Sequence, residues 1–176
     1  MQQYPPQAPL WLLSAIYDSP RFAERCLIWE NLNSVAELHA MPWVIVGDFN
    51  EVLMGDDKFG GRLVNLSRAL RFQECLDNCN MIDIGFFGPR YTWFIRRPLS
   101  RLIQERIDRV FLNTEWNSLY PEVAVFHLEM IELNHCPVKL CMDNNRTVQF
   151  PKPFRFQPMW FSHPSFPGVV KDAWSS

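Results

Sequence analysis

The sequence predicts an α/β protein in which helices are layered on a mixed β-sheet. Two observations lead to this prediction: helical spacing of apolar residues occurs in the first half of the chain, and short apolar strands follow one another in the second half. The chain has 176 residues, of which 48% are hydrophobic and 14% aromatic. This is sufficient for one globular domain with a substantial core.

The first half of the chain alternates strand and helix. We expect Ser19 to cap the first helix and Pro20 to occupy its first position. The stretch before the second helix is rich in glycine and aspartate, which favours a loop. In order, the expected elements are a strand at 11–17, a helix at 20–39, a strand at 43–49, a loop at 51–65 and a helix at 67–79.

Short apolar runs predict five strands in the second half, with a one-turn helix capped by Asn113 or Thr114 between the third and the fourth. The strands are expected at 81–86, 90–95, 105–113, 122–130 and 136–142. After Asp143 the chain becomes rich in proline and aromatic residues without steady periodicity. We therefore expect an irregular N-terminus at 1–10, a folded part at 11–143 and a linker-like extension at 144–176.

Charge and composition exclude several classes of protein. The formal net charge is −2, so the chain lacks the overall basic field of a strong nonspecific nucleic-acid binder. No apolar run is long enough to cross a membrane, and the first residues lack the basic region of a signal peptide, so we expect an intracellular protein. Five scattered cysteines indicate reduced thiols. Cys75 and Cys79 have the spacing of half a metal site, but buried free cysteine is the commoner explanation.

Polar side chains appear where the second strand ends. The run "WVIVGDFNEVL" at 43–53 passes from apolar residues directly into Asp48 and Asn50, which strand alternation directs to one side. Ligands of open α/β sheets bind beyond strand ends, so this carboxylate and amide could orient a water molecule or hold a phosphate. An Asx-turn that caps the loop is the alternative explanation.

A second polar pair is expected between two later strands. Asp108 lies inside an apolar strand, where an isolated carboxylate is costly and needs a partner. His135 begins a neighbouring strand and would have its tautomer fixed by that carboxylate. The alternatives are a core histidine for His135, and an ion pair with Arg106 or Arg109 for Asp108.

Seven short motifs occur in one order along the chain: "YDSP", "GDFNE", "GGR", "MIDIGFFGPRYTW", "ERIDR", "EWNSLYP" and "LNHCP". Together they resemble the endonuclease/exonuclease/phosphatase superfamily, and more closely the endonuclease domain of plant-type LINE retrotransposons. The tail segment "FRFQPMWFSHPSF" is similar to the segment that joins that endonuclease to a reverse transcriptase. The resemblance extends from about Trp11 to about Trp174 and implies part of a four-layered α/β sandwich.

The resemblance implies metal-dependent hydrolysis of DNA phosphodiesters, with Mg²⁺ as the cofactor. Asp48 and Asn50 would orient the attacking water and contact the phosphate. His135 would stabilise the charged phosphoryl oxygen, and Asp108 would orient His135. The substrate-binding residues implied are Tyr17, Trp93 and Arg106.

Two departures from the family pattern predict a truncated and inactive relative. The family's first strands, which supply a metal-binding glutamate, have no counterpart before Trp11, and their loss would uncover a sheet edge and an apolar face. Asn134 stands where the family has a metal-binding aspartate. Because Mg²⁺ relies on carboxylate oxygens, we expect no intact metal site and weak or no binding. A functional protein would act on DNA in the nucleus, with a reverse transcriptase downstream and no membrane.

Two other functions remain open. One is an active nuclease or phosphatase with a makeshift metal site, completed by Asp18, Glu51, Asp56 or Asp57. The other is a noncatalytic nucleic-acid-binding module, in which arginines and interleaved aromatic residues between Arg90 and Arg109 bind a strand. The same run also suits two strands with core aromatics and solvated arginines.

Overall fold

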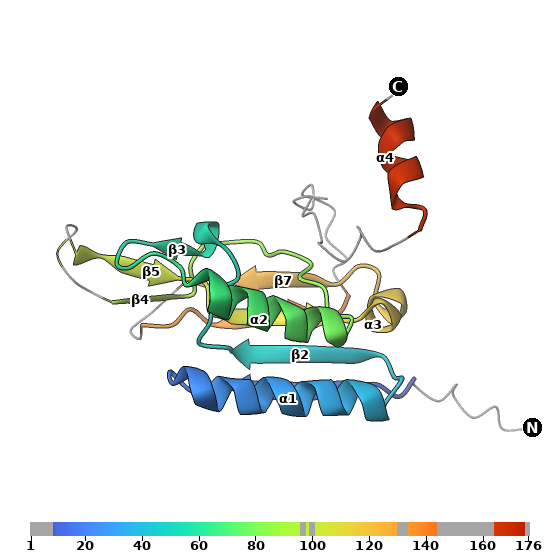
Figure 1. Ribbon diagram of the computed structural model, residues 1–176, viewed down its shortest axis with the longest axis horizontal. Helices are drawn as coiled ribbons and strands as arrows, with labels where there is room; N and C mark the ends of the chain where they lie inside the picture. Colours follow the sequence, from blue (N-terminus) through green and yellow to red (C-terminus); the bar gives the residue numbers. More distant parts are fainter. Residues whose placement is uncertain (1–8, 96–97, 99–100, 130–133, 144–163, 175–176) are drawn as a thin grey trace, which may run out of the picture. The chain divides into compact units, whose positions relative to one another are not determined.

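Strands and helices alternate in the first half of the chain, and strands predominate in the second half (Figure 1). The computed structural model describes residues 9–95, 98, 101–129, 134–143 and 164–174. The elements are β1 (Leu12–Tyr17), α1 (Phe22–Leu38), β2 (Trp43–Asp48), the 3₁₀ turn η1 (Gly55–Asp57), β3 (Lys58–Phe59), α2 (Leu66–Asn78), β4 (Trp93–Ile95), β5 (Ile103–Glu105), β6 (Asp108–Leu112), α3 (Thr114–Leu119), β7 (Ala124–His127), β8 (Val138–Cys141) and α4 (Phe166–Trp174). The chain divides into two units, Met1–Arg146 and Thr147–Ser176.

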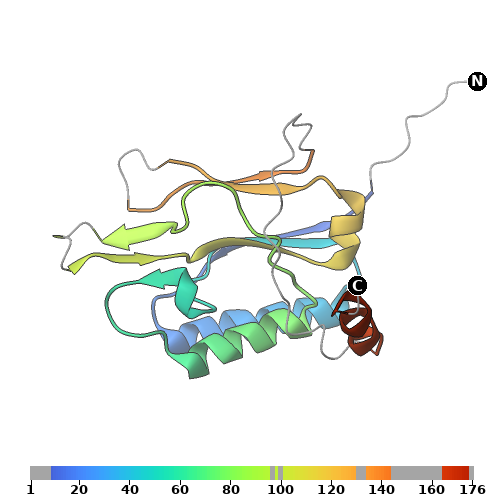
Figure 2. The same cartoon turned by 90° about the horizontal axis from the view of Figure 1, so that it is seen from above.

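The last residues of two strands and the first residue of a third lie side by side at one end of the central sheet. Its order is β1-β2-β6, with β1 parallel to β2 and β6 antiparallel to β2. In this register Asp48 lies opposite Tyr17 on one side and Asp108 on the other. Helices α1 and α2 cover one face of the sheet, and the hairpin β7-β8 lies on the other (Figure 2).

Strand alternation divides the apolar residues of β2 between two cores. Trp43 and Ile45 pack with Trp29 of α1 and Phe72 of α2 under the helices. Val44 packs on the opposite face with residues of β6, α3 and β7. This alternation explains why the continuous apolar run of β2 forms one strand that is buried on both sides.

Helix α1 begins later than expected. Its N-cap is Arg21, because Asp18 is still attached to the sheet through its N–H, which donates to the Asp48 carbonyl over 2.8 Å. The hydroxyl of Ser19 nevertheless accepts a hydrogen bond from the Arg21 N–H over 3.1 Å. The apolar residues whose helical spacing predicted this helix face the core, since Trp29 and Leu32 are buried and Phe22 packs against the same cluster.

Helix α2 (Leu66–Asn78) lies within one residue of the helix that was predicted at 67–79. Asn65 caps the helix, and Phe72, Cys75, Leu76 and Cys79 are buried. All five cysteines are free, and the Cys75 thiol donates to the Trp29 carbonyl over 3.5 Å. The two helical cysteines are therefore core residues, as the commoner explanation held.

The later strands are shorter than expected. The run at 105–113 is divided into β5 and β6 around Arg106 and Ile107, and 81–86 forms only one bridge, between Ile82 and Leu112. Asn113 caps α3, as predicted, through its side-chain oxygen. Three elements were not predicted: η1 and β3 lie in the expected loop, and α4 lies in the expected linker. Residue 130 of the fourth predicted strand lies outside the described residues.

One face of the central sheet is hollowed beside β8. The hollow has a volume of about 490 Å³ and is mainly apolar, with Trp11, Val44, Val138 and Leu140 among its walls. Strand β1 lies at the end of its sheet, and Leu13 and Tyr17 are exposed. No described helix has the length and apolar character needed to cross a bilayer.

Candidate active site

The turn after β2 places a carboxylate and an amide at the end of this strand. Gly47 has a φ of 143°, and a Cβ at this position would lie 1.9 Å from the Ile16 carbonyl oxygen, so only glycine fits. Asn50 has a φ of 47°, a left-handed conformation that asparagine tolerates. Its backbone N–H donates to Asp48 Oδ1 over 2.8 Å. The alternative Asx-turn is therefore present, and it also fixes the position of the carboxylate.

The amide of Asn50 ties this turn to the end of β1. Nδ2 donates to the Asp18 carbonyl over 2.8 Å and to Asp48 Oδ2 over 3.1 Å. Both oxygens of Asp48 are thus oriented by the same neighbour. The sequence prediction that Asp48 and Asn50 lie on one side of the strand end is confirmed.

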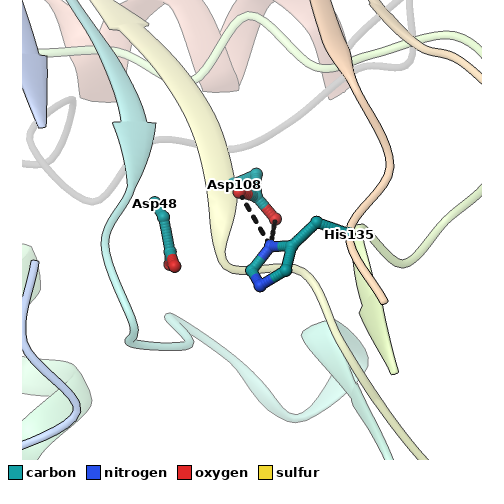
Figure 3. A group of neighbouring side chains, drawn as sticks. All are labelled: Asp48, Asp108 and His135. Atoms are coloured by element: carbon teal, nitrogen blue, oxygen red, sulfur yellow. Dashed lines mark hydrogen bonds and ion pairs between the residues drawn. The ribbon is translucent and has the colours of Figure 1, made fainter. Parts of the chain in front are cut away.

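Asp108 and His135 form the predicted pair. Nδ1 of His135 lies 3.0 Å and 3.2 Å from the two carboxylate oxygens of Asp108, and the other ring nitrogen points away from that carboxylate (Figure 3). An Nδ1–H group donates a hydrogen bond to the carboxylate, and Nε2, on the other side of the ring, faces away from Asp108. The alternative of a core histidine is excluded, because the His135 side chain is 34% exposed.

Asp48 joins this pair to form a possible metal-binding group. One ligand atom each from Asp48, Asp108 and His135 lies within 4.8 Å of the others. Burial raises the pKa of Asp48, and the charge of Asp108 raises it further. A divalent cation would offset this repulsion, and hard cations commonly take one or two protein carboxylates and complete their shell with water and phosphate oxygens. The residues therefore fit such an ion, although the sequence predicted no intact metal site.

The four acids proposed to complete a makeshift site have other surroundings. Glu51 is buried and accepts from Arg25 and Arg68, both over 2.9 Å. Asp56 is exposed and pairs with Arg90, and Asp57 belongs to the network described next. Asp18 is fully buried. None of these four carboxylates belongs to the described metal-binding group.

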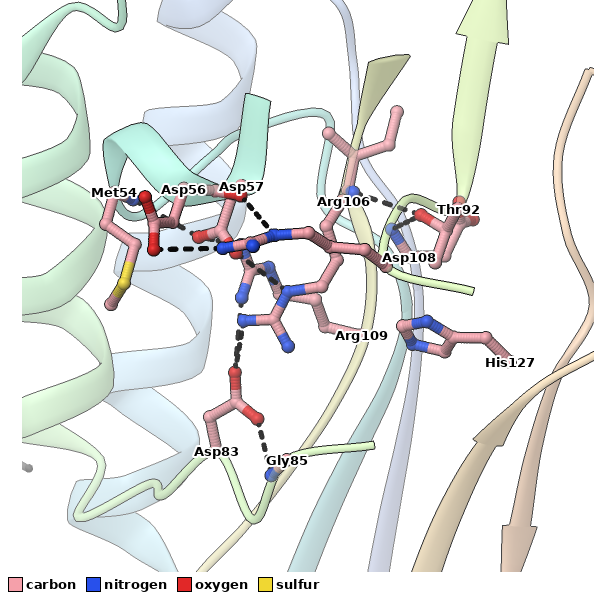
Figure 4. A network of polar contacts seen from close by, with 12 residues as sticks. Met54, Asp56, Asp57, Asp83, Gly85, Thr92, Arg106, Asp108, Arg109 and His127 are labelled. Atoms are coloured by element: carbon pink, nitrogen blue, oxygen red, sulfur yellow. Dashed lines mark hydrogen bonds and ion pairs between the residues drawn. The ribbon is translucent and has the colours of Figure 1, made fainter. Parts of the chain in front are cut away.

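Arg106 was predicted to bind substrate, and the structure corrects this. It is 2% exposed, and its guanidinium donates to Asp57 over 2.8 Å and to Asp83 over 2.6 Å (Figure 4). Arg109 binds the same two carboxylates, at 2.6 Å and 3.2 Å. Both arginines that could have paired with Asp108 are therefore engaged elsewhere. The sequence could not indicate this, because Asp57 and Asp83 are distant along the chain.

This burial also weakens the expectation of an arginine-rich binding surface. Of the four arginines between 90 and 109 that the structure describes, Arg106 and Arg109 are buried, Arg90 is exposed and pairs with Asp56, and Arg101 is exposed. Arg96 and Arg97 lie outside the described residues.

Two other predicted substrate residues lie beside the group. Trp93 forms a bridge with His135, and their ring centroids are 6.4 Å apart. Tyr17 is 87% exposed and lies opposite Asp48 in the sheet. Asn134 is exposed, and its backbone carbonyl accepts from the Phe94 N–H over 3.0 Å. Contact of Tyr17 or Trp93 with a substrate remains a prediction.

Thr92 was overlooked in the sequence. It is fully buried, and its hydroxyl accepts hydrogen bonds from the backbone of Ile107 and Asp108. A hydroxyl between two large aromatic residues in a strand, "YTW", is the one local signal that could have drawn attention to it.

Three solved structures share this arrangement of strands and helices. An AP endonuclease from Leishmania major superposes with a TM-score of 0.53 and 17% identity, covering 66% of this chain and 41% of its own. The endonuclease domain of TRAS1, a telomere-specific non-LTR retrotransposon, has a TM-score of 0.54 and 14% identity, covering 75% and 56%. The 3′ phosphatase NExo from Neisseria, bound to product DNA hairpin, has a TM-score of 0.56 and 22% identity, covering 74% and 60%.

The fold is of the endonuclease/exonuclease/phosphatase type. The chain spans 41% to 60% of the lengths of these three structures. No family model matches the sequence, and no curated protein matches it. The fold class predicted from the motifs is therefore confirmed by three-dimensional similarity at low sequence identity.

Proposed function

We propose that this chain is part of a retroelement-type endonuclease domain whose chemistry is metal-dependent hydrolysis of DNA phosphodiesters. The observation that supports this most directly is the convergence of Asp48, Asp108 and His135 at one end of the central sheet. A similar fold in a retrotransposon endonuclease domain agrees with it. A reverse transcriptase of the same element is the implied partner.

In this proposal the residues of the chain divide the work. Asp48 and Asn50 orient a water molecule at the end of β2, since the Asn50 N–H and amide already fix the carboxylate. His135 presents its outward ring nitrogen to a phosphate oxygen, and Asp108 holds the imidazole in place through Nδ1. Asp48 and Asp108 would hold Mg²⁺, which when bound supplies Lewis-acid stabilisation of the phosphate.

We further propose that residues 1–176 by themselves hydrolyse DNA poorly. Within the metal-binding group, both oxygens of Asp108 lie within hydrogen-bonding distance of His135, and both oxygens of Asp48 accept from Asn50. Each carboxylate would therefore have to share its oxygens between a cation and a neighbouring donor. Asn134, next to His135, offers a neutral amide in place of a charge. Weak metal affinity is the expected consequence, since Mg²⁺ binding depends on carboxylate oxygens.

Nicking of supercoiled plasmid with Mg²⁺ or Mn²⁺ tests both parts of the proposal, with a 3′-phosphorylated oligonucleotide in parallel to separate phosphatase from endonuclease activity. The unmodified chain and Asn134→Asp alone should show no nicking above background. Activity should appear only when the preceding segment of a related endonuclease is joined and Asn134→Asp is present, because ligands that act as a unit are strongly non-additive.

His135→Ala should abolish the activity of the joined protein, and His39→Ala, at an exposed histidine after α1, is the matched control. Metal-dependent nicking by the unmodified chain that is lost on His135→Ala would show an active enzyme instead. A joined protein that remains inactive would contradict the proposed chemistry.

A further inference from the structure

We propose that Thr92 is the positioning residue that fixes Asp108 against His135. The inference deepens the proposed function, since this pair is its charge-stabilising element. Thr92 is fully buried in the segment between Gly88 and β4, so it acts through its neighbours and not through solvent. Its polar groups contact both of the segments that bear the pair.

The hydroxyl of Thr92 holds the chain at Asp108. Oγ1 accepts the N–H of Ile107 over 3.1 Å and the N–H of Asp108 over 2.9 Å (Figure 4). These two N–H groups lie at the break between β5 and β6, where the ladder to a neighbouring strand is interrupted. The hydroxyl therefore replaces a strand partner at the residue that carries the carboxylate.

The backbone of Thr92 holds the chain beside His135. Its carbonyl accepts the N–H of Cys136 over 2.6 Å, and its own N–H donates to the Glu105 carbonyl over 3.0 Å. Thr92 is thus hydrogen-bonded to two segments of the chain, one bearing Asp108 and the other bearing His135. These two residues are 27 positions apart in the sequence. Any residue supplies the backbone contacts, but the two contacts to the Asp108 segment need a side-chain acceptor.

Substitution of this hydroxyl should alter the imidazole before it alters the fold. Thr92→Val keeps the shape but leaves two buried N–H groups without an acceptor, so the Asp108 segment must move toward another partner or water. The carboxylate then no longer lies within hydrogen-bonding reach of Nδ1. Because that bond selects which ring nitrogen carries the proton, its loss changes the tautomer of His135.

The test is the tautomer of His135, measured at pH 9 from the ¹⁵N shifts of its two ring nitrogens in the full chain. The unmodified protein should carry the proton on Nδ1. Thr92→Val should shift the population toward Nε2–H, and Thr92→Ser, which retains the acceptor, should restore the native pattern. The measurement requires no catalysis, so it is independent of whether the chain hydrolyses DNA.

Asn113→Ala is the matched control. Oδ1 of Asn113 accepts the N–H groups of Trp43 and Trp116, both over 2.9 Å, at the other end of β6. The same kind of contact is therefore lost away from the site, and the His135 tautomer should not change. A native tautomer in Thr92→Val, or an equal shift in Asn113→Ala, would overturn the positioning role.

A measurement on the unmodified protein covers the case in which Thr92→Val does not fold. The backbone amides of Ile107 and Asp108 should be strongly protected from hydrogen exchange, because the Thr92 hydroxyl is their acceptor. Thr92→Cys, with a weaker acceptor, should speed their exchange and shift the tautomer in part. Amides at 107 and 108 that exchange freely in the unmodified protein would overturn the proposal.

Discussion

At the scale of single residues, Asp18 shows that burial can outweigh favourable contacts. Its side chain is fully buried at the end of β1, and Oδ1 accepts the Ser19 N–H over 2.8 Å. Oδ2 has no hydrogen-bond donor among the described residues. Burial is the main cause that raises the pKa of Asp18 to about 6, against the lowering effects of the Ser19 N–H and the Arg25 charge. The carboxylate therefore destabilises the folded chain at neutral pH.

Asp18→Asn should stabilise the protein in a pH-dependent way. The folded pKa of about 6 lies above the ordinary aspartate pKa of 3.8, so the cost of ionising Asp18 is absent below about pH 3.8 and complete above about pH 6. At pH 8 we expect a gain of roughly 2–3 kcal/mol in the free energy of unfolding, which disappears as the pH approaches 4. Urea titrations at several pH values measure it. An equal effect at pH 4 and pH 8 would contradict this, and Glu30→Gln on the exposed face of α1 is the control.

At the scale of elements, Trp29 attaches α1 to α2. Its ring stacks on Phe72 with centroids 5.1 Å apart and meets Phe22 edge to face at 5.8 Å. The side chain is 4% exposed. Aromatic pairs in a core stabilise a protein beyond the effect of the apolar area that they bury. This one residue therefore contributes much of the contact between the two helices.

Trp29→Ala should lower the free energy of unfolding by roughly 3–5 kcal/mol, because it removes a buried ring and leaves a cavity. Leu27→Ala on the outer face of the same helix is the control, since Leu27 is 59% exposed and the change should cost under about 0.5 kcal/mol. Chemical denaturation of both variants gives the comparison. A loss below about 1 kcal/mol for Trp29→Ala would show that α1 packs only loosely.

At the scale of the whole molecule, three buried charged side chains and the half-buried Asp83 connect parts that are distant along the chain. Asp57 comes from the loop after β2, Asp83 from the segment after α2, and Arg106 and Arg109 from the region of β6 (Figure 4). Burial alone would raise the pKa of Asp83, but the two arginine charges overcome this and hold it at about 2. The network therefore stabilises the fold above about pH 3.8 and loses its effect as the pH falls toward 2.

Asp57→Ala should destabilise the chain by roughly 3–5 kcal/mol at pH 7, because it leaves two buried guanidinium groups without one of their carboxylates. Asp56→Ala, at the exposed neighbour, should cost under about 1 kcal/mol. The difference between the two variants should shrink as the pH falls below 3.8, since the arginine charges depress the pKa of Asp57 as well. Thermal unfolding across this pH range measures it, and a constant difference down to pH 2 would be contrary to expectation.

Local patterns in the sequence determined the elements and the place of the site. The apolar stripes of α1 and α2, the Asn113 cap and the strand that ends at Asp48 depend on neighbours a few residues away, so their spacing is visible in one dimension. The order of the motifs was also sufficient to predict the fold class and the meeting of Asp108 with His135.

The tertiary structure alone decided which charges pair and where strands break. Arg106 looked available to a substrate until the fold brought Asp57 and Asp83 to it. At the break between β5 and β6, the N–H groups of Ile107 and Asp108 donate to the hydroxyl of Thr92, which lies 15 and 16 residues away along the chain. Buried charges and N–H groups need partners, and three-dimensional packing selects those partners from distant parts of the sequence. Such contacts therefore leave no periodic signal along the chain.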